Sequence, residues 1–265
     1  MNLRLSFPVA AFYGGLAILA LILAASLLLP ARDRRHPNLD STGRVLEPSG
    51  LTYHPERGTL IAAGDEGQVA EFSLQGEVLA DVYLGGDFEG ITCDPDRRRI
   101  YVVEEKDEAL LVLDWDTLAE VDRWSLRAIA AEAGLPADRN DGFEGIVYQP
   151  ATGEKRGFLW LAHQHRPAMI LRVEITDGDP PLALLEAFDA GLGELSGLSI
   201  DPRNGGLVAI SDEENALAEI SPDGRVLNRT PLQGIYQEGI AFIPNGDFYI
   251  ADDRGGIFHY PAWAN

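Results

Sequence analysis

The chain has 265 residues, of which 46% are hydrophobic and 24% charged, a composition typical of a globular domain. A formal net charge of -21 without a basic stripe argues against nucleic acid as a partner, since the phosphate backbone would be repelled. Cys93 is the single cysteine, so an intrachain disulfide is excluded. The acidity indicates either a solvated surface or a protein that binds cations.

The first element in chain order is an apolar segment. Leu5 to Ala31 contains no charged residue and is long enough to cross a bilayer as a helix. We therefore predict that residues 1–31 are a transmembrane helix that anchors the protein in a membrane. A cleaved signal peptide is the alternative, because Arg4 gives a basic start and Ala24 to Ser26 offers small residues for cleavage.

Residues 32–42 form a polar linker, and residues 43–265 contain five copies of one unit. Each copy has a glycine followed by Ile or Leu at the start of a short apolar strand. These glycines lie 40, 55, 52 and 42 residues apart, at Gly50, Gly90, Gly145, Gly197 and Gly239. Up to three further strand patterns follow each glycine. Four short strands per unit predict one propeller blade, so the fold class is all-β and the domain a five-bladed β-propeller.

Two segments depart from this repeat. The last copy lacks a fourth strand, and we expect Gly43 to Glu47 to supply it and close the ring. Ser125 to Gly142 is predicted to form one short helix and a loop between the second and third units. A β-sandwich is the alternative fold, since short strands separated by turns look alike in sequence. The constant phase of the repeat favours the propeller.

Carboxylates recur at two points of the unit. Glu89, Glu144 and Glu238 stand directly before a repeat glycine, and Ser49 and Ser196 take this place in the other copies. In a blade, the innermost strand starts at the face where the second strand ends. The ends of the second strands add further acids and two histidines at that face: Asp65, Glu66, Glu104, Glu105, His163, His165, Asp212, Glu213, Glu214, Asp252 and Asp253.

Such a concentration of acids is costly without a counter-ion. Two like charges about 4 Å apart repel by roughly 4 kcal/mol at an effective dielectric constant of 20. Ca²⁺ takes six to eight oxygen ligands in flexible geometry, so the sequence predicts a Ca²⁺ site at the channel mouth. The alternative is structural: the glutamates would accept hydrogen bonds from loop amides of neighbouring blades. His163 and His165 lack a third ligand for a Zn²⁺ site, and no residue is assigned to catalysis.

The phrases "LEPSGLTYHP", "DFEGITCDP", "DGFEGIVYQP", "LSGLSIDP" and "QEGIAFIPNGDFYIADD" occur in this order. Together they resemble the SdiA-regulated or YjiK-type family, whose relatives include calcium-regulated β-propeller proteins. The resemblance implies a membrane-associated or periplasmic propeller linked to calcium and related to phytase-like propellers. It implies metal ligands at the strand mouths, Glu89, Glu144 and Glu238, and at strand ends, Glu105, Glu213 and Asp253. The third unit departs from the pattern with "HQHRP".

Two classes of function remain open for such a site. As a binding or signalling module, the protein would hold Ca²⁺ and offer the acidic face to another envelope protein or a small ligand. As an enzyme, it would use the metal to hydrolyse a phosphate ester, as in phytase-like propellers, or another ester. Only four cations lie near the proposed face: Lys106, Arg139, Arg166 and Arg254. Since a phosphate substrate needs basic partners, we expect binding rather than catalysis.

The expected location is the bacterial inner membrane, with one membrane-spanning helix and a periplasmic propeller, or secretion if the segment is cleaved. Arg32, Arg34 and Arg35 conflict with this orientation. They follow the apolar segment, and the positive-inside rule would keep them in the cytoplasm.

Overall fold

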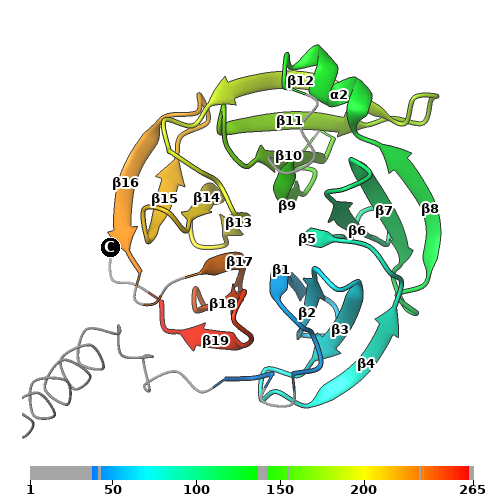
Figure 1. Cartoon of the computed structure of the whole chain (residues 1–265), viewed down its shortest axis with the longest axis vertical. Helices are drawn as coiled ribbons and strands as arrows, with labels where there is room; N and C mark the ends of the chain where they lie inside the picture. The colour runs from blue at the N-terminus through cyan, green and yellow to red at the C-terminus, as the bar shows by residue number, and fades with distance from the viewer. Residues whose placement is uncertain are drawn as a thin grey trace, which may run out of the picture. The chain divides into compact units, whose positions relative to one another are not determined.

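Five antiparallel sheets stand around a central axis, with one strand of each nearest the centre (Figure 1). The computed structural model describes residues 38–40, 43–136, 142–153, 156–232, 234 and 236–262. Four sheets have four strands and one has three. The predicted all-β, five-bladed propeller is therefore confirmed.

The blades follow one another along the chain. The strands are, in order, β1 (Pro48–His54), β2 (Thr59–Gly64), β3 (Gln68–Phe72) and β4 (Val78–Tyr83) in blade 1; β5 (Phe88–Asp94), β6 (Arg99–Glu104), β7 (Ala109–Asp114) and β8 (Glu120–Ser125) in blade 2; β9 (Phe143–Gln149), β10 (Phe158–His163), β11 (Met169–Ile175) and β12 (Leu182–Asp189) in blade 3; β13 (Gly197–Asp201), β14 (Gly206–Ser211), β15 (Ala216–Ile220) and β16 (Val226–Pro231) in blade 4; and β17 (Gln237–Phe242), β18 (Phe248–Asp252) and β19 (Ile257–Tyr260) in blade 5.

The repeat glycines are the points where neighbouring blades touch near the axis. A Cβ on Gly50 would lie 3.0 Å from the carbonyl oxygen of Glu89, and one on Gly239 would lie 2.6 Å from that of Ser49. Gly90, Gly145 and Gly197 face the backbone of the next blade in the same way. Only glycine permits such close approach of two backbones. The recurrence of this residue therefore follows from closing five blades around a narrow axis.

The ring closes through the beginning of the described chain, although not at the predicted place. Asn38 bridges Phe258 of β19, and the N–H group of Leu39 donates to the carbonyl oxygen of Ile257 at 2.8 Å. The prediction that Gly43 to Glu47 forms this strand is wrong. The carboxylate of Asp40 accepts hydrogen bonds from the N–H groups of Arg44 and Val45. These local bonds bend the segment, so it does not adopt the extended backbone of a strand, and Val45 is buried in the core.

The predicted helix is present as α2 (Arg127–Glu132), in the connection between β8 and β9. Its buried residues Ile129 and Ala130 belong to a hydrophobic cluster that also contains residues of blades 2 and 3. The helix therefore covers the junction of these two blades.

Over the described residues, there is no helix with the length and apolar character needed to span a membrane. The apolar segment predicted to be an anchor, residues 1–31, lies outside the described residues. Of the predicted linker, residues 32–37, 41 and 42 lie outside them as well.

Candidate functional site

The channel mouth brings together buried carboxyl groups of blades 2 and 3. Glu89 and Glu144 are 8% and 6% exposed, and their side chains form a hydrogen bond with each other. Burial, and then the charge of Asp65, raises the pKa of Glu89 well above its usual value. Burial and the charge of Glu89 do the same for Glu144. Both carboxyl groups therefore favour the protonated form more than an exposed glutamate does.

Glu238 lies at the blade 4 side of this cluster. Burial raises its pKa well above the usual value, with further contributions from Glu194 and Asp212. Glu194 is 5% exposed, and burial raises its pKa to about 7. One carboxylate oxygen of Glu194 accepts hydrogen bonds from the Ser211 hydroxyl and the Glu213 N–H group. The acidic mouth thus extends across to blade 4.

Asp65, directly after β2, belongs to two groups of neighbouring carboxylates. Oxygen atoms of Asp65, Asp87 and Glu89 all lie within 4.8 Å of one another, and so do those of Glu47, Asp65 and Asp253. The Ser49 hydroxyl donates to Asp65 at 2.6 Å. Burial nevertheless raises the pKa of Asp65 to about 7. A pocket of about 420 Å³ opens beside it, lined by Glu47, Asp65, Glu66, Tyr83, Gly86, Asp87 and Lys106.

Lys106 and Arg254, two of the four cations considered above, have different partners. The Lys106 ammonium group lies 2.8 Å from a carboxylate oxygen of Asp87. The Arg254 guanidinium lies over the ring of Tyr236, 3.7 Å from its centroid. Arg139, one of the four cations considered above, lies outside the described residues. Lys106 and Arg254 therefore do not form a joint phosphate-binding pair.

Of the six carboxylates predicted as metal ligands, five interact with the cluster just described. Glu89, Glu144 and Glu238 form its core, Asp253 shares a group of oxygens with Asp65, and Glu105 contributes charge to Glu89 and Glu144. Glu213 differs: it is exposed and belongs to neither group of oxygens. In its place Asp212, one residue earlier, acts on Glu238 and accepts a hydrogen bond from the Tyr236 N–H group at 2.6 Å.

Several residues of the cluster were missing from the predicted ligand set, although the repeat contains a signal for three of them. Glu47, Asp87 and Glu194 each stand three residues before a repeat glycine. The glutamates and serines stand one residue before it. In an extended segment, residues two apart face the same side, which places both positions toward the mouth for Asp87 and Glu194; Glu47 has a left-handed backbone with a φ of 47°. An acid at this earlier position marks three of the five copies.

Hydrogen bonds from loop amides distinguish the acids at strand ends from the three channel glutamates, Glu89, Glu144 and Glu238. Glu104 accepts from the N–H group of Asp107 at 2.8 Å, and Glu105 accepts from that of Gly142 at 3.2 Å. Over the part of the chain that the structure describes, no backbone amide donates to Glu89, Glu144 or Glu238. The structural alternative therefore applies to acids at strand ends and leaves the channel glutamates without this explanation.

The histidines of the third blade do not add a described metal site. Nδ1 of His163 lies 2.9 Å from the carbonyl oxygen of Pro167, and the ring packs edge-on against Phe143. Among described residues, no group of three metal-ligating atoms includes His163 or His165.

The raised pKa values predict how stability depends on pH without divalent cations. Asp65 and Glu194 have pKa values of about 7 in the folded chain, against about 4 when unfolded. Between about pH 4 and 7 the folded chain holds more protons, so stability falls as pH rises. We expect the melting temperature in chelator to drop by several degrees from about pH 5 to 7.5. A constant or rising melting temperature over this range contradicts the assignment.

A model of the family described as SdiA-regulated matches residues 40–189 and 185–259. Glutaminyl cyclase of Myxococcus xanthus is similar in fold, with a TM-score of 0.61 and 18% identity over 81% of this chain and 89% of that one.

Two other solved structures are more distant. Hydrazine synthase of Kuenenia stuttgartiensis has a TM-score of 0.49 and 16% identity, over 78% of this chain and 55% of that one. A Bacteroides caccae protein has a TM-score of 0.45 and 16% identity, over 72% and 63%. The family match spans most of the described domain and confirms the resemblance in the sequence. The chain therefore belongs to the SdiA-regulated family.

Proposed function

We propose that this propeller is a divalent-cation-binding module whose acidic mouth binds Ca²⁺ between Asp65, Asp87 and Glu89. The observation that carries the proposal is the approach of three carboxylate oxygens to within 4.8 Å of one another. Ca²⁺ binds oxygen at about 2.3–2.6 Å, so oxygens on opposite sides of one ion lie up to about 5 Å apart. The donors are hard oxygen atoms, as this ion prefers.

The raised pKa values of the buried carboxyl groups explain why a cation would bind here. Burial raises the pKa values of Glu89 and Glu144 well above the usual value, and Asp65 has a pKa of about 7. A cation next to Asp65 and Glu89 favours their ionised forms, so binding at neutral pH releases protons. Carboxylate oxygens of Glu47 and Asp253 also lie within 4.8 Å of Asp65, so these two residues can supply further ligands to an ion bound beside Asp65.

Magnesium is the less suitable ion for this mouth. Mg²⁺ requires nearly octahedral oxygen ligands at about 2.0–2.1 Å and keeps several of its water molecules. The oxygen groups here come from β5, from the turns after β2 and β18 and from the segments before β1 and β5, which favours an ion that accepts irregular geometry.

The module is further proposed to be attached to the bacterial inner membrane through residues 1–31, with the propeller in the periplasm. The uncharged run from Leu5 to Ala31 supports the anchor. In this arrangement Ca²⁺ would order the acidic mouth, and the loops around it would bind an envelope protein or a small ligand. The output of such a protein is calcium-linked binding or signalling.

Phosphate-ester or other ester hydrolysis at the same metal is the alternative function. Lys106 is already paired with Asp87, and Arg254 lies on Tyr236, so neither cation is aimed at a shared substrate position. The likeness to glutaminyl cyclase concerns the fold and assigns no residue of this chain. The contacts of the cations therefore favour binding.

Calorimetric titration of the full chain in detergent, after chelator treatment, tests the proposal. We expect saturable Ca²⁺ binding with a dissociation constant within about 10⁻⁷ to 10⁻³ M, and weaker Mg²⁺ binding. Asp65→Asn should weaken Ca²⁺ binding at least tenfold, because Asp65 belongs to both oxygen groups. Proton release, measured by repeating the titration in buffers of different ionisation enthalpy, should accompany binding.

Glu213→Gln is the matched control, since Glu213 is an exposed acid at the same face outside both groups. Its Ca²⁺ affinity should equal that of the wild type. Absence of Ca²⁺ binding by the folded wild type, or equal losses in the two variants, overturns the proposal.

A further inference from the structure

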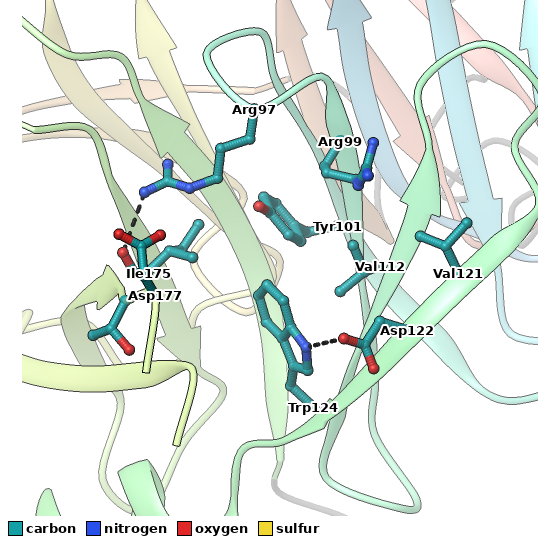
Figure 2. Close-up of a pocket in the computed structure, with 10 residues that line it drawn as sticks. Arg97, Arg99, Tyr101, Val112, Val121, Asp122, Trp124, Ile175 and Asp177 are labelled. Carbon is teal, nitrogen blue, oxygen red and sulfur yellow. Dashed lines mark hydrogen bonds between the residues drawn. The ribbon is translucent and has the colours of Figure 1, made fainter. Parts of the chain in front are cut away.

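A second pocket lies away from the acidic mouth, at the seam between blades 2 and 3 (Figure 2). Its volume is about 380 Å³, within the range of about 300–1,000 Å³ found for small-molecule sites. Strands β6, β7 and β8 form one wall, and the turn after β11 forms the other. This turn and the β5–β6 turn lie at the opposite ends of their strands from the mouth. The proposed cation site contributes none of the lining residues.

Two aromatic rings form the floor of this pocket. Tyr101 is fully buried, and the centroids of Tyr101 and Trp124 lie 5.7 Å apart at an interplanar angle of 40°. The Trp124 indole N–H group donates to the carboxylate of Asp122 at 2.8 Å, and the Tyr101 hydroxyl donates to Asp94 at 3.2 Å. These bonds fix both rings, and a fixed apolar surface loses little entropy when a ligand ring packs on it.

Charged groups flank the rings on both sides, as Figure 2 shows, with Arg97 and Asp177 on one side and Arg99 on the other. Arg97 is already engaged, because its guanidinium donates to the Asp94 carboxylate and to the Ile175 carbonyl oxygen, each at 3.2 Å. Arg99 donates to the carbonyl oxygen of Arg98 at 2.8 Å, and its charge also acts on the cross-strand carboxylate of Asp114 without an ion pair between the two. Within the described ranges, Arg99 and Asp177 have no ion pair, so each retains a charge for a ligand.

The charge pattern selects among classes of ligand. A phosphate or other simple anion would meet Asp122 and Asp177, and a simple cation would meet Arg99 and Arg97. An uncharged apolar molecule would leave the charges of Arg99 and Asp177 without partners as it displaced their water. A molecule that carries both charges and a ring satisfies all of these groups at once.

We propose that this pocket binds a zwitterionic aromatic amino acid or short peptide, with its carboxylate on Arg99, its ammonium group near Asp177 and its ring against Trp124. An adjoining pocket of about 330 Å³ shares Arg97 and Asp177 and extends toward Tyr148 and Arg156. Because Arg99 and Asp177 stand on opposite sides of the rings (Figure 2), a dipeptide, whose charged ends lie farther apart than those of a single amino acid, is the preferred ligand.

The test is calorimetric titration of the full chain, in chelator, with the dipeptide Phe-Ala and with two derivatives that each lack one charge. Phe-Ala should bind saturably in the micromolar to millimolar range. N-acetyl-Phe-Ala lacks the ammonium group and Phe-Ala amide lacks the carboxylate, so each should bind about tenfold more weakly. If either derivative binds as tightly as Phe-Ala, or if Phe-Ala does not bind the folded protein, the proposal is wrong.

Two charge variants assign the ends of the ligand. Arg99→Ala should weaken Phe-Ala binding about tenfold and leave binding of the amide unchanged. Asp177→Asn should weaken Phe-Ala binding similarly and leave binding of the N-acetyl form unchanged. Arg123→Ala is the control, because Arg123 lies next to Trp124 on β8 but pairs with Glu120 and does not line the pocket. A loss in Arg123→Ala equal to that in Arg99→Ala would overturn the proposal.

Discussion

Gly90→Ala is expected to destabilise the protein by about 3 kcal/mol, the upper end of the usual cost of overpacking. A Cβ at this position would collide with the carbonyl oxygen of Glu144 and lie 3.0 Å from the backbone nitrogen of Ile146. These are backbone atoms of the next blade, and they can move only if blades 2 and 3 separate. A loss of this size lowers the melting temperature by about 6–12 °C in a domain of this length.

Circular dichroism during thermal unfolding measures this effect. Gly178→Ala is the control, since a Cβ there would make only ordinary contacts, 3.6 Å from the Thr176 hydroxyl oxygen and 4.0 Å from a carbonyl oxygen. This variant should unfold within about 2 °C of the wild type, because surface substitutions change stability by about 0.5 kcal/mol or less. Equal melting temperatures for the two variants would show that the repeat glycines are not needed for blade contact.

Glu144→Gln is expected to stabilise the protein at pH 7.5 in chelator, by about 1–2 kcal/mol. The amide keeps the shape of the side chain, removes one charge from the buried pair and donates a hydrogen bond to Glu89. The melting temperature should rise by about 2–8 °C. Its decrease with pH should also become less steep, because one of the carboxyl groups with a raised pKa is gone.

Glu104→Gln provides the opposite case with the same change. Glu104 is 3% exposed, and its two carboxylate oxygens accept from the N–H groups of Asp107 and Asp87. An amide group places N–H donors against one of these amides, so this variant should lose about 1–3 kcal/mol. If both variants lose stability, the repulsion assigned to the channel glutamates is absent.

Most of the fold could be predicted because the repeat glycines show where each blade begins. Five glycines before an apolar strand define the innermost strands, and β1, β5, β9, β13 and β17 all begin near them. The closing strand could not be placed in the same way, since it lies outside the repeat. Its position depends on Asp40, whose carboxylate holds two amide groups four and five residues later.

Prediction of the site was limited by turns rather than strands. Glu89 and Glu238 could be assigned to the mouth because each stands directly before a repeat glycine at the start of an innermost strand, β5 or β17. Asp212 and Glu213 follow β14 in a turn, where the direction of a side chain depends on local backbone geometry. Sequence position alone therefore could not distinguish the acid that acts on Glu238 from its exposed neighbour.

The contact between Asn38 and β19 determines when the ring can form during synthesis. Its partners are separated by 219 positions in the chain, so β19 is made long after the Asn38 segment that it pairs with. Blades 1 to 4 can assemble as the chain emerges from the ribosome, while the Asn38 segment has no partner until β19 has been translated. Until then, blades 1 and 5 cannot meet, and the side of blade 1 that packs against β17 stays uncovered.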